Sequence, residues 1–406
     1  MALGSNMRPG SATVSTSGQE QNVPKHPGFD AAIDKLGGSV YSALAPRIAT
    51  LKGELYPLHI GDTWKDPGPG MSWKDTPDNG VDRPHRYSNP AGINELLDDL
   101  IIKVRERNQL DIEGPGNITV TAGATGALYV AARATVCAGD EVMILAPYWP
   151  LVGGIAVTVG ATAVEVPILH RSFDADELNR VLEQTVTDKT AAIYLNTPSN
   201  PVGVVFDEAK LAVVAEFAKR HSLWIWSDEV YEDYVFEGAH LSIGRMAPER
   251  TLTAFSFSKA YGMAGYRCGY LVGPKDAISR ARKALTYVWY STPTPSQLIA
   301  REAIKNSADW VVAARKSYQE MGYWSADRLG LARPHGSTFL FLDATKYLDD
   351  RGLTGFLLDC IEDNIILAPG SSFGPSFGNW VRICYTSVPP EVVKRGIEKL
   401  AKRLGR

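Results

Sequence analysis

The stretch TLTAFSFSKAYGMAGYRCG, residues 251–269, joins a β-rich run to a polar turn that contains glycine. Ser256 ends the run, Lys259 comes three residues later, and Arg267 comes eight residues after the lysine. Ligands of α/β sheets bind beyond the carboxyl ends of the strands. A lysine placed there can lose its proton when burial removes it from water, and the free amine can then attack a carbonyl group. Considered alone, the tetrad SFSK is explained equally well by a solvated loop lysine.

Strands and helices alternate on the N-terminal side of this stretch. The β-rich runs are ITVT, EVMIL, AAIYL, LWIWS and TLTAFS, which begin near residues 118, 141, 191, 223 and 251. Amphipathic helical patterns occupy residues 94–108 and 207–221. Such alternation is typical of a mainly parallel α/β sheet.

The pattern changes after about residue 300. A long helical pattern at residues 307–330 precedes the β-rich runs TFLFLDA, NIILAPG and VRICYTS, and the chain ends in the helical pattern EVVKRGIEKLAKRLG. A chain of 406 residues is also too long for one comfortable core. The sequence therefore predicts a large α/β domain and a smaller α+β domain.

Composition argues against several other classes of protein. The formal net charge is −3 and no basic stretch dominates, so neither nucleic acid nor an anionic membrane is an expected partner. The chain has no apolar run of about 18 residues that could span a membrane, and its N-terminus lacks the apolar core of a secretory signal. We expect a cytoplasmic protein without a metal site. Its cysteines are expected to be small buried hydrophobic residues: Cys137, Cys268, Cys360 and Cys384.

Polar residues also follow the other predicted strands. Asp228 and Tyr231 follow LWIWS, and the turn NTPSNPVG, residues 196–203, follows AAIYL. The small residues of TAGATG, residues 121–126, would expose backbone N–H groups at the start of a helix, where an anion is favoured. Without the lysine, a helix N-cap and a core tyrosine are the simpler interpretations of Asp228 and Tyr231.

In this order, the segments resemble the signature elements of fold-type I aminotransferases, the class I/II or aspartate aminotransferase superfamily, from about Gly61 to Arg382. The resemblance implies the fold of pyridoxal 5'-phosphate (PLP) dependent transferases. It also implies that Lys259 carries PLP as a Schiff base and later moves the proton of the substrate α-carbon. Ser256 and Arg267 would hold the cofactor phosphate, for which a planar guanidinium is well suited.

The resemblance assigns further residues to the cofactor ring. Asp228 would bond to the pyridine nitrogen and keep it protonated, which makes the ring an electron sink. Tyr231 and Asn200 would bond to the phenolic oxygen, and Trp149, from the segment APYWP, would stack on the ring. Val202 replaces the usual Thr of the family motif NxPxNPTG, at a position that does not bind the cofactor.

The phosphate end of the site has two more matches. Ala124 and Thr125 match the loop that cradles the phosphate, and Tyr87 matches the tyrosine of a YxxxxG element that reaches the phosphate of the partner subunit. The resemblance therefore implies a homodimer with its active sites at the interface, although an ordinary loop aromatic would also explain Tyr87. Some members that act on acidic substrates carry Lys in place of Thr125, so its absence favours a non-acidic substrate.

At the substrate end, Arg382 would clamp the α-carboxylate, Gly61 would add a backbone contact, and Asn200 and Trp149 would also line the site. An interdomain salt bridge is the alternative for Arg382. Four aromatic residues fall in loops that flank the family's substrate pocket: Trp64, Trp73, Trp289 and Tyr290. We divide the chain into a disordered segment (1–24), an N-terminal part of the small domain (25–60), a large PLP-binding domain (61–300) and a C-terminal small domain (301–406).

The predicted function is amino transfer from a non-acidic L-amino acid to a 2-oxo acid by a ping-pong mechanism. Other PLP chemistry on the same scaffold remains open: C–S β-lyase, elimination, ACC-synthase-like or oxidase activity would also need Lys259, Asp228 and Arg382. A PLP-binding gene regulator is disfavoured, because only about 30 residues precede the predicted domain and no basic helix-turn-helix is present.

Overall fold

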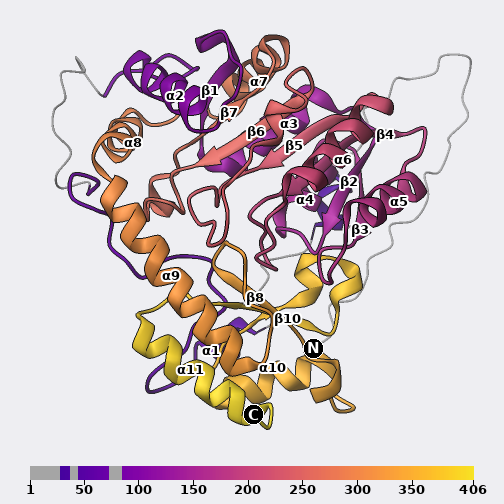
Figure 1. The fold of residues 1–406 in the computed structure, drawn as a ribbon, viewed down its shortest axis with the longest axis vertical. Coiled ribbons are helices and arrows are strands. Elements are labelled where there is room, and N and C mark those ends of the chain that lie inside the picture. The colour runs from indigo at the N-terminus through magenta and orange to yellow at the C-terminus, as the bar shows by residue number, and fades with distance from the viewer. Residues whose placement is uncertain (1–27, 37–43, 73–84) are drawn as a thin grey trace, which may run out of the picture.

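The computed structural model describes residues 28–36, 44–72 and 85–406. Figure 1 shows a large sheet surrounded by helices in the upper part of the molecule and a smaller sheet with its own helices below. The segment 1–24, which was expected to be disordered, lies outside the described residues. Within the described residues, no helix has the length and apolarity needed to cross a membrane.

The larger sheet has seven strands within the described residues, in the order β1-β7-β6-β5-β4-β2-β3. They are β1 (Ile118–Thr121), β2 (Glu141–Ala146), β3 (Thr162–Pro167), β4 (Thr190–Asn196), β5 (Trp224–Asp228), β6 (Thr251–Ser256) and β7 (Gly269–Val272). β7 is antiparallel to both of its neighbours, and the other pairs are parallel. The predicted mainly parallel α/β sheet is confirmed, although β3 and β7 were not predicted.

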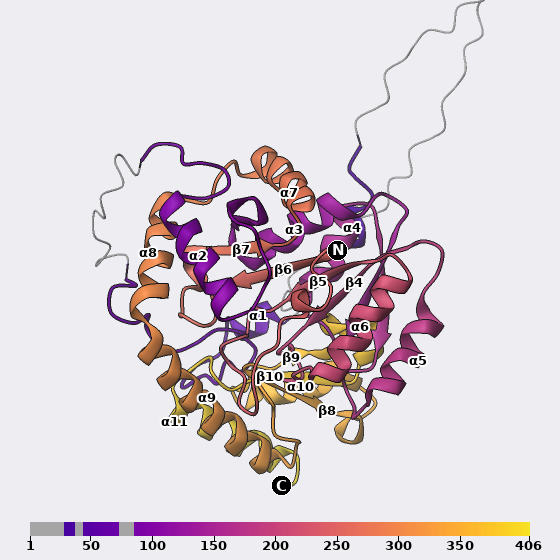
Figure 2. The same ribbon diagram turned by 45° about the horizontal axis from the view of Figure 1, so that its top comes forward.

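Helices cover both faces of this sheet because side chains alternate along its strands. On β2, Val142 and Ile144 join one core and Met143 and Leu145 join the other. The helices of the large region are α2 (Asn94–Glu106), α3 (Gly123–Thr135), α4 (Leu151–Thr158), α5 (Ala175–Thr185), α6 (Glu208–Arg220), α7 (Lys275–Val288) and α8 (Thr294–Asn306). In Figure 2, α2 and α8 lie side by side near β7.

The smaller sheet has the antiparallel order β8-β10-β9. Its strands are β8 (Phe339–Asp343), β9 (Ala368–Pro369) and β10 (Trp380–Cys384), and its helices are α1 (Ala45–Ile48), α9 (Ala308–Leu329), α10 (Gly352–Glu362) and α11 (Pro390–Arg403). Tyr56 and Leu58 share the core of this region. That packing supports the proposal that residues 25–60 belong to the small domain.

Two local expectations were wrong. The run NIILAPG forms only the two-residue strand β9, because Ile365 instead makes an isolated bridge with Tyr56. Cys137 is exposed, whereas the other three cysteines are buried. It follows α3 in a turn, where its N–H donates to Asp140 Oδ2 at 2.7 Å, and so its apolar neighbours in sequence do not enclose it.

Candidate active site

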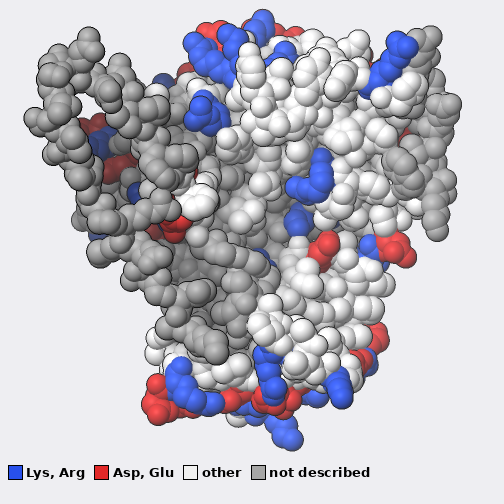
Figure 3. All heavy atoms as spheres, turned by 180° about the vertical axis from the view of Figure 1, so that it is seen from behind, with Lys and Arg blue, Asp and Glu red and all other residues white. Residues whose placement is uncertain are grey.

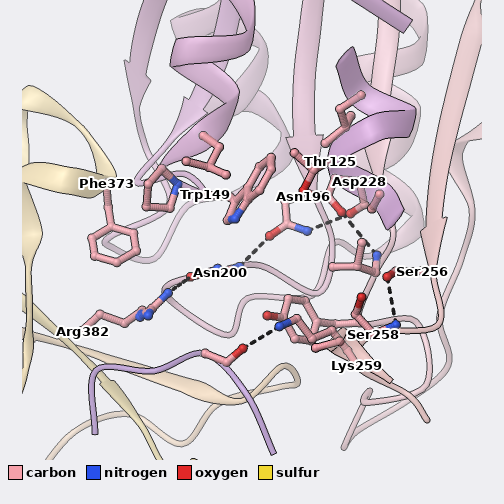
Figure 4. A pocket seen from close by; sticks show the side chains of 18 of the residues that line it. Thr125, Trp149, Asn196, Asn200, Asp228, Ser256, Ser258, Lys259, Phe373 and Arg382 are labelled. Carbon is pink, nitrogen blue, oxygen red and sulfur yellow. Dashed lines mark hydrogen bonds between the residues drawn. The ribbon is translucent and has the colours of Figure 1, made fainter. Parts of the chain in front are cut away.

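A cavity of about 300 Å³ lies at the carboxyl ends of β4, β5 and β6 and extends to β10 of the smaller sheet (Figure 4). All twelve residues predicted for the site belong to the described part of the chain, and eleven of them line this cavity. They are Gly61, Ala124, Thr125, Trp149, Asn200, Asp228, Tyr231, Ser256, Lys259, Arg267 and Arg382. The fold thus brings together residues that are more than 300 positions apart in sequence.

Lys259 is held by the chain segment that precedes the large sheet. It follows β6, and its Nζ donates to the carbonyl oxygen of Gly61 at 2.5 Å. Burial lowers the pKa of Lys259 below that of an ordinary lysine, against the opposing effect of Asp62. The fold therefore favours a neutral, nucleophilic amine at this position.

Asp228 ends β5 and is buried, with only 3% of the residue exposed. Its Oδ2 accepts a hydrogen bond from the Tyr194 hydroxyl at 2.8 Å. Burial raises the pKa of Asp228 to about 6, against the effect of that hydrogen bond. Burial also raises the pKa of Tyr231 well above its ordinary value, so its hydroxyl stays protonated near neutral pH.

Arg267 lies against the glycine turn that begins α3. It adopts the left-handed conformation with φ 52°, which is uncommon for a residue with a side chain. A Cβ on Gly123 would lie 2.6 Å from Arg267 Nη2, and a Cβ on Gly269 would lie 2.7 Å from the Gly123 carbonyl carbon. Glycine at both positions therefore allows the guanidinium to approach the start of α3 closely.

The same corner supplies several donors to an anion. Ala124 and Thr125 belong to the first turn of α3, where backbone N–H groups have no helical acceptor. Arg267 Nη1 donates to the carbonyl of Ala264 at 2.8 Å, and no carboxylate in the described parts of the chain forms an ion pair with its guanidinium. Ser256 Oγ accepts from the N–H of Ser258 at 3.0 Å and retains its own proton for donation.

Arg382 enters the cavity from β10 (Figure 4). Its guanidinium carbon lies 4.2 Å from the centre of the Phe339 ring and 4.8 Å from that of Phe373. Nη1 donates to Asn200 Oδ1 at 3.0 Å, and Nη2 donates to the His59 carbonyl at 2.7 Å. Aromatic walls and fixed acceptors thus set the direction of a buried guanidinium.

Three contributors were missed at the sequence level. Asn196 Oδ1 accepts from the N–H of Asn200 at 2.6 Å, and its Nδ2 donates to the Asp228 carbonyl at 2.8 Å. Tyr194 lies two residues earlier on β4, and the period of a strand places it on the same face as Asn196. That period gives the face of Tyr194 but not its contact with Asp228, and no local signal indicates that Phe373 lines the cavity.

Tyr87 is the predicted site residue that does not line the cavity. It is 87% exposed, and its ring centre lies 4.9 Å from that of Tyr290. Of the aromatic residues expected to flank the substrate pocket, Trp64, Trp289 and Tyr290 are not among its lining residues, and Trp73 lies outside the described residues.

Comparisons with known proteins agree with this geometry. Residues 76–400 match the family model of aminotransferases of class I and II. A probable aspartate/prephenate aminotransferase of Thermus aquaticus is 33% identical over 79% of this chain and 84% of its own length. The chain belongs to the class I and II aminotransferases. An aspartate aminotransferase of Thermus thermophilus, solved with maleate, is 29% identical with a TM-score of 0.83 over 93% of this chain and all of its own.

A third relative of this aminotransferase has a different name. It is an aromatic-amino-acid aminotransferase of Thermococcus litoralis, 29% identical over 78% of this chain and 84% of its own length. The protein is an enzyme, a PLP-dependent aminotransferase of the fold predicted from the sequence, and members of its family use PLP. The relatives do not favour the lyase, elimination, ACC-synthase-like or oxidase alternatives.

Proposed function

We propose that PLP binds in this cavity with Lys259 as its covalent attachment point. The observation that supports this most strongly is the close approach of Arg267 to Gly123 at the start of α3, in a cavity that Arg382 also lines. A guanidinium, helix N–H groups and the Ser256 hydroxyl form a donor set that suits a phosphate. A buried acid and a lysine with a lowered pKa line the same cavity, so the residues present fit the cofactor.

Bound PLP supplies an electron sink for the negative charge that forms when the substrate α-carbon loses its proton. In this proposal Asp228 accepts a hydrogen bond from the ring nitrogen, and Tyr231 and Asn200 bond to the phenolic oxygen. Trp149 covers a face of the ring. Lys259, freed from the cofactor, takes the α-proton at its Nζ, for which its lowered pKa is suited.

We also propose that the substrate is an L-amino acid with an apolar or aromatic side chain. Arg382 would bind its α-carboxylate, with Gly61 beside it. The remaining lining includes Leu151, Pro150 and Phe373. Within the described residues, the lining contains no Lys or Arg besides Lys259, Arg267 and Arg382, so it offers no further cation to a second carboxylate.

A half-reaction assay tests both parts of this proposal. The holoenzyme is mixed with single L-amino acids in the absence of a 2-oxo acid, and the cofactor spectrum is followed. We expect loss of the PLP band, return of the band when a 2-oxo acid is added, and a higher kcat/KM for L-phenylalanine than for L-aspartate. Preference for L-aspartate would overturn the substrate class alone, whereas continuous ammonia release with an unchanged spectrum would overturn amino transfer.

We further propose that the enzyme is a homodimer in which Tyr87 contacts the partner subunit's cofactor. Four large side chains are exposed in the single subunit: Tyr87, Tyr287, Val288 and Tyr290. Exposure of several large apolar residues is usual at an interface that a second copy covers. The middle of the face in Figure 3 carries few charged side chains, which lie mainly along its upper and lower margins. Light scattering should give twice the monomer mass, and a monomer that retains full activity would contradict the proposal. The cytoplasmic location stays a prediction.

A further inference from the structure

Tyr194 is a fully buried tyrosine whose hydroxyl reaches Asp228 from the neighbouring strand. Its ring packs in the core between the sheet and α3, and it is not a lining residue of the cavity. β4 and β5 run parallel, with Tyr194 opposite Trp226 and Asn196 opposite Asp228. The side chains of Tyr194 and Asp228 therefore lie on the same face of the sheet, and the Tyr194 OH donates to Asp228 Oδ2 at 2.8 Å.

Apart from Tyr194, Asp228 has few hydrogen-bond or charged partners in the described residues. The N–H of Val230 lies 3.4 Å from Oδ1, which is a long hydrogen bond, and in the described part of the chain no Lys, Arg or His forms an ion pair with this carboxylate. The charged groups that act on it are Glu229, which disfavours its ionisation, and Lys259, which favours it. The hydroxyl of Tyr194 is thus the closest donor to Asp228.

We propose that Tyr194 is a positioning residue that fixes the Asp228 carboxylate and favours its ionised form. This inference rests on the proposed function, in which Asp228 faces the ring nitrogen of the cofactor. A carboxylate accepts a stronger hydrogen bond when it is ionised than when it is protonated. The bond to Oδ2 also restricts rotation of the side chain and leaves the other oxygen available to the cofactor.

The test compares two deletions of a single buried hydroxyl. Tyr194→Phe removes the donor to Asp228 and keeps the ring. Tyr385→Phe is the matched control, because Tyr385 is equally buried and its OH donates to the Ser337 carbonyl at 3.0 Å. For each variant we would measure the PLP dissociation constant of the cofactor-free protein, its thermal unfolding, and kcat and KM at saturating PLP.

We expect Tyr194→Phe to weaken PLP binding and to lower kcat, each by about tenfold, with little change in KM, since hydrogen bonds to charged groups are the strong ones. Tyr385→Phe should leave the dissociation constant and kcat near wild type. A purely structural role would instead lower the thermal stability of both variants and leave PLP binding unchanged.

Combination with Asp228→Asn separates failure of this inference from failure of the proposed function. If Tyr194 acts through the charge of Asp228, Tyr194→Phe should have no further effect in the Asp228→Asn background. Two results would overturn the role of Tyr194 alone. One is the same loss from Tyr194→Phe in the wild-type and the Asp228→Asn backgrounds. The other is wild-type PLP binding by Tyr194→Phe when Asp228→Asn binds PLP more weakly. Wild-type turnover by Asp228→Asn would overturn the assignment of Asp228 itself.

Discussion

Two buried carboxylates, one at the end of β5 and one on the turn after it, have opposite surroundings. Asp228 faces the cavity, bonds to the neutral hydroxyl of Tyr194, and has a pKa of about 6 that burial raises. Glu232, four residues later, faces α2 and accepts from Lys103 Nζ at 2.5 Å and from Asn108 Nδ2 at 2.6 Å. Burial also opposes its ionisation, but Lys103 and Arg107 lower the pKa of Glu232 to about 2.

The difference shows how one turn can serve both catalysis and stability. Cationic partners hold Glu232 and Asp233 to the end of α2, since Arg107 pairs with Asp233. Asp228 has no such cation in the described residues, and the proposed function gives it one in the protonated ring nitrogen of PLP. The turn is therefore anchored on one side while its other side keeps an acid available to the cofactor.

The largest expected effect is on turnover. Asp228→Asn removes the charge that would keep the ring nitrogen protonated, and we expect kcat to fall by about a thousandfold with PLP still bound. Steady-state kinetics at saturating PLP measures this. Glu232→Gln, on the other side of the turn, should reduce kcat far less. An equal loss of kcat in the two variants would contradict a catalytic role that is specific to Asp228.

The next effect is on stability. Lys103→Met leaves Glu232 buried without its closest cation, and we expect unfolding of the cofactor-free protein to become easier by about 3–5 kcal/mol. Urea denaturation measures this free energy. Replacing both partners, Lys103→Met with Glu232→Met, should recover part of the loss. Lys219→Met, which removes an exposed ion pair with Glu216, is the control and should change little.

A smaller effect is the pH dependence of stability, which has opposite signs for Asp228 and Glu232. The folded-state pKa of Asp228 is raised, so its burial destabilises the cofactor-free protein progressively as pH rises from about 4, the unfolded value, to about 6, the folded value. Above that range Asp228→Asn should be more stable than wild type by about 2–3 kcal/mol, and below it the two should converge. Glu232 has the opposite sign, because its pKa is lowered and its contribution is lost as pH falls from about 4.5 toward about 2. Urea titrations at several pH values would contradict the account if the Asp228→Asn difference did not depend on pH.

The sequence predicted those parts of the site that depend on strand ends. Lys259, Asp228 and Asn200 follow β-rich runs, and parallel strands bring their carboxyl ends to one edge. It did not predict β3, a partly exposed edge strand that contains Glu165, or β7, which has only four residues next to Gly269.

Contacts between distant segments could not be predicted from local sequence patterns. Phe373 reaches the cavity because its carbonyl accepts from the N–H of Tyr148 at 2.9 Å, which joins a loop near β9 to the segment after β2. Tyr194 lay within the predicted run AAIYL, but its bond to Asp228 requires that β4 and β5 be neighbours in a known register. Side-chain period alone gives the face of a strand and not its partner.

The most direct test of the central claim is chemical labelling of the lysine that holds the cofactor. The holoenzyme would be reduced with borohydride, digested, and mapped by mass spectrometry, with Lys259→Ala as the comparison. The account predicts a reduced PLP adduct on Lys259 and none in Lys259→Ala. An adduct on another lysine of the wild-type enzyme, or a reducible adduct that persists in Lys259→Ala, would contradict it.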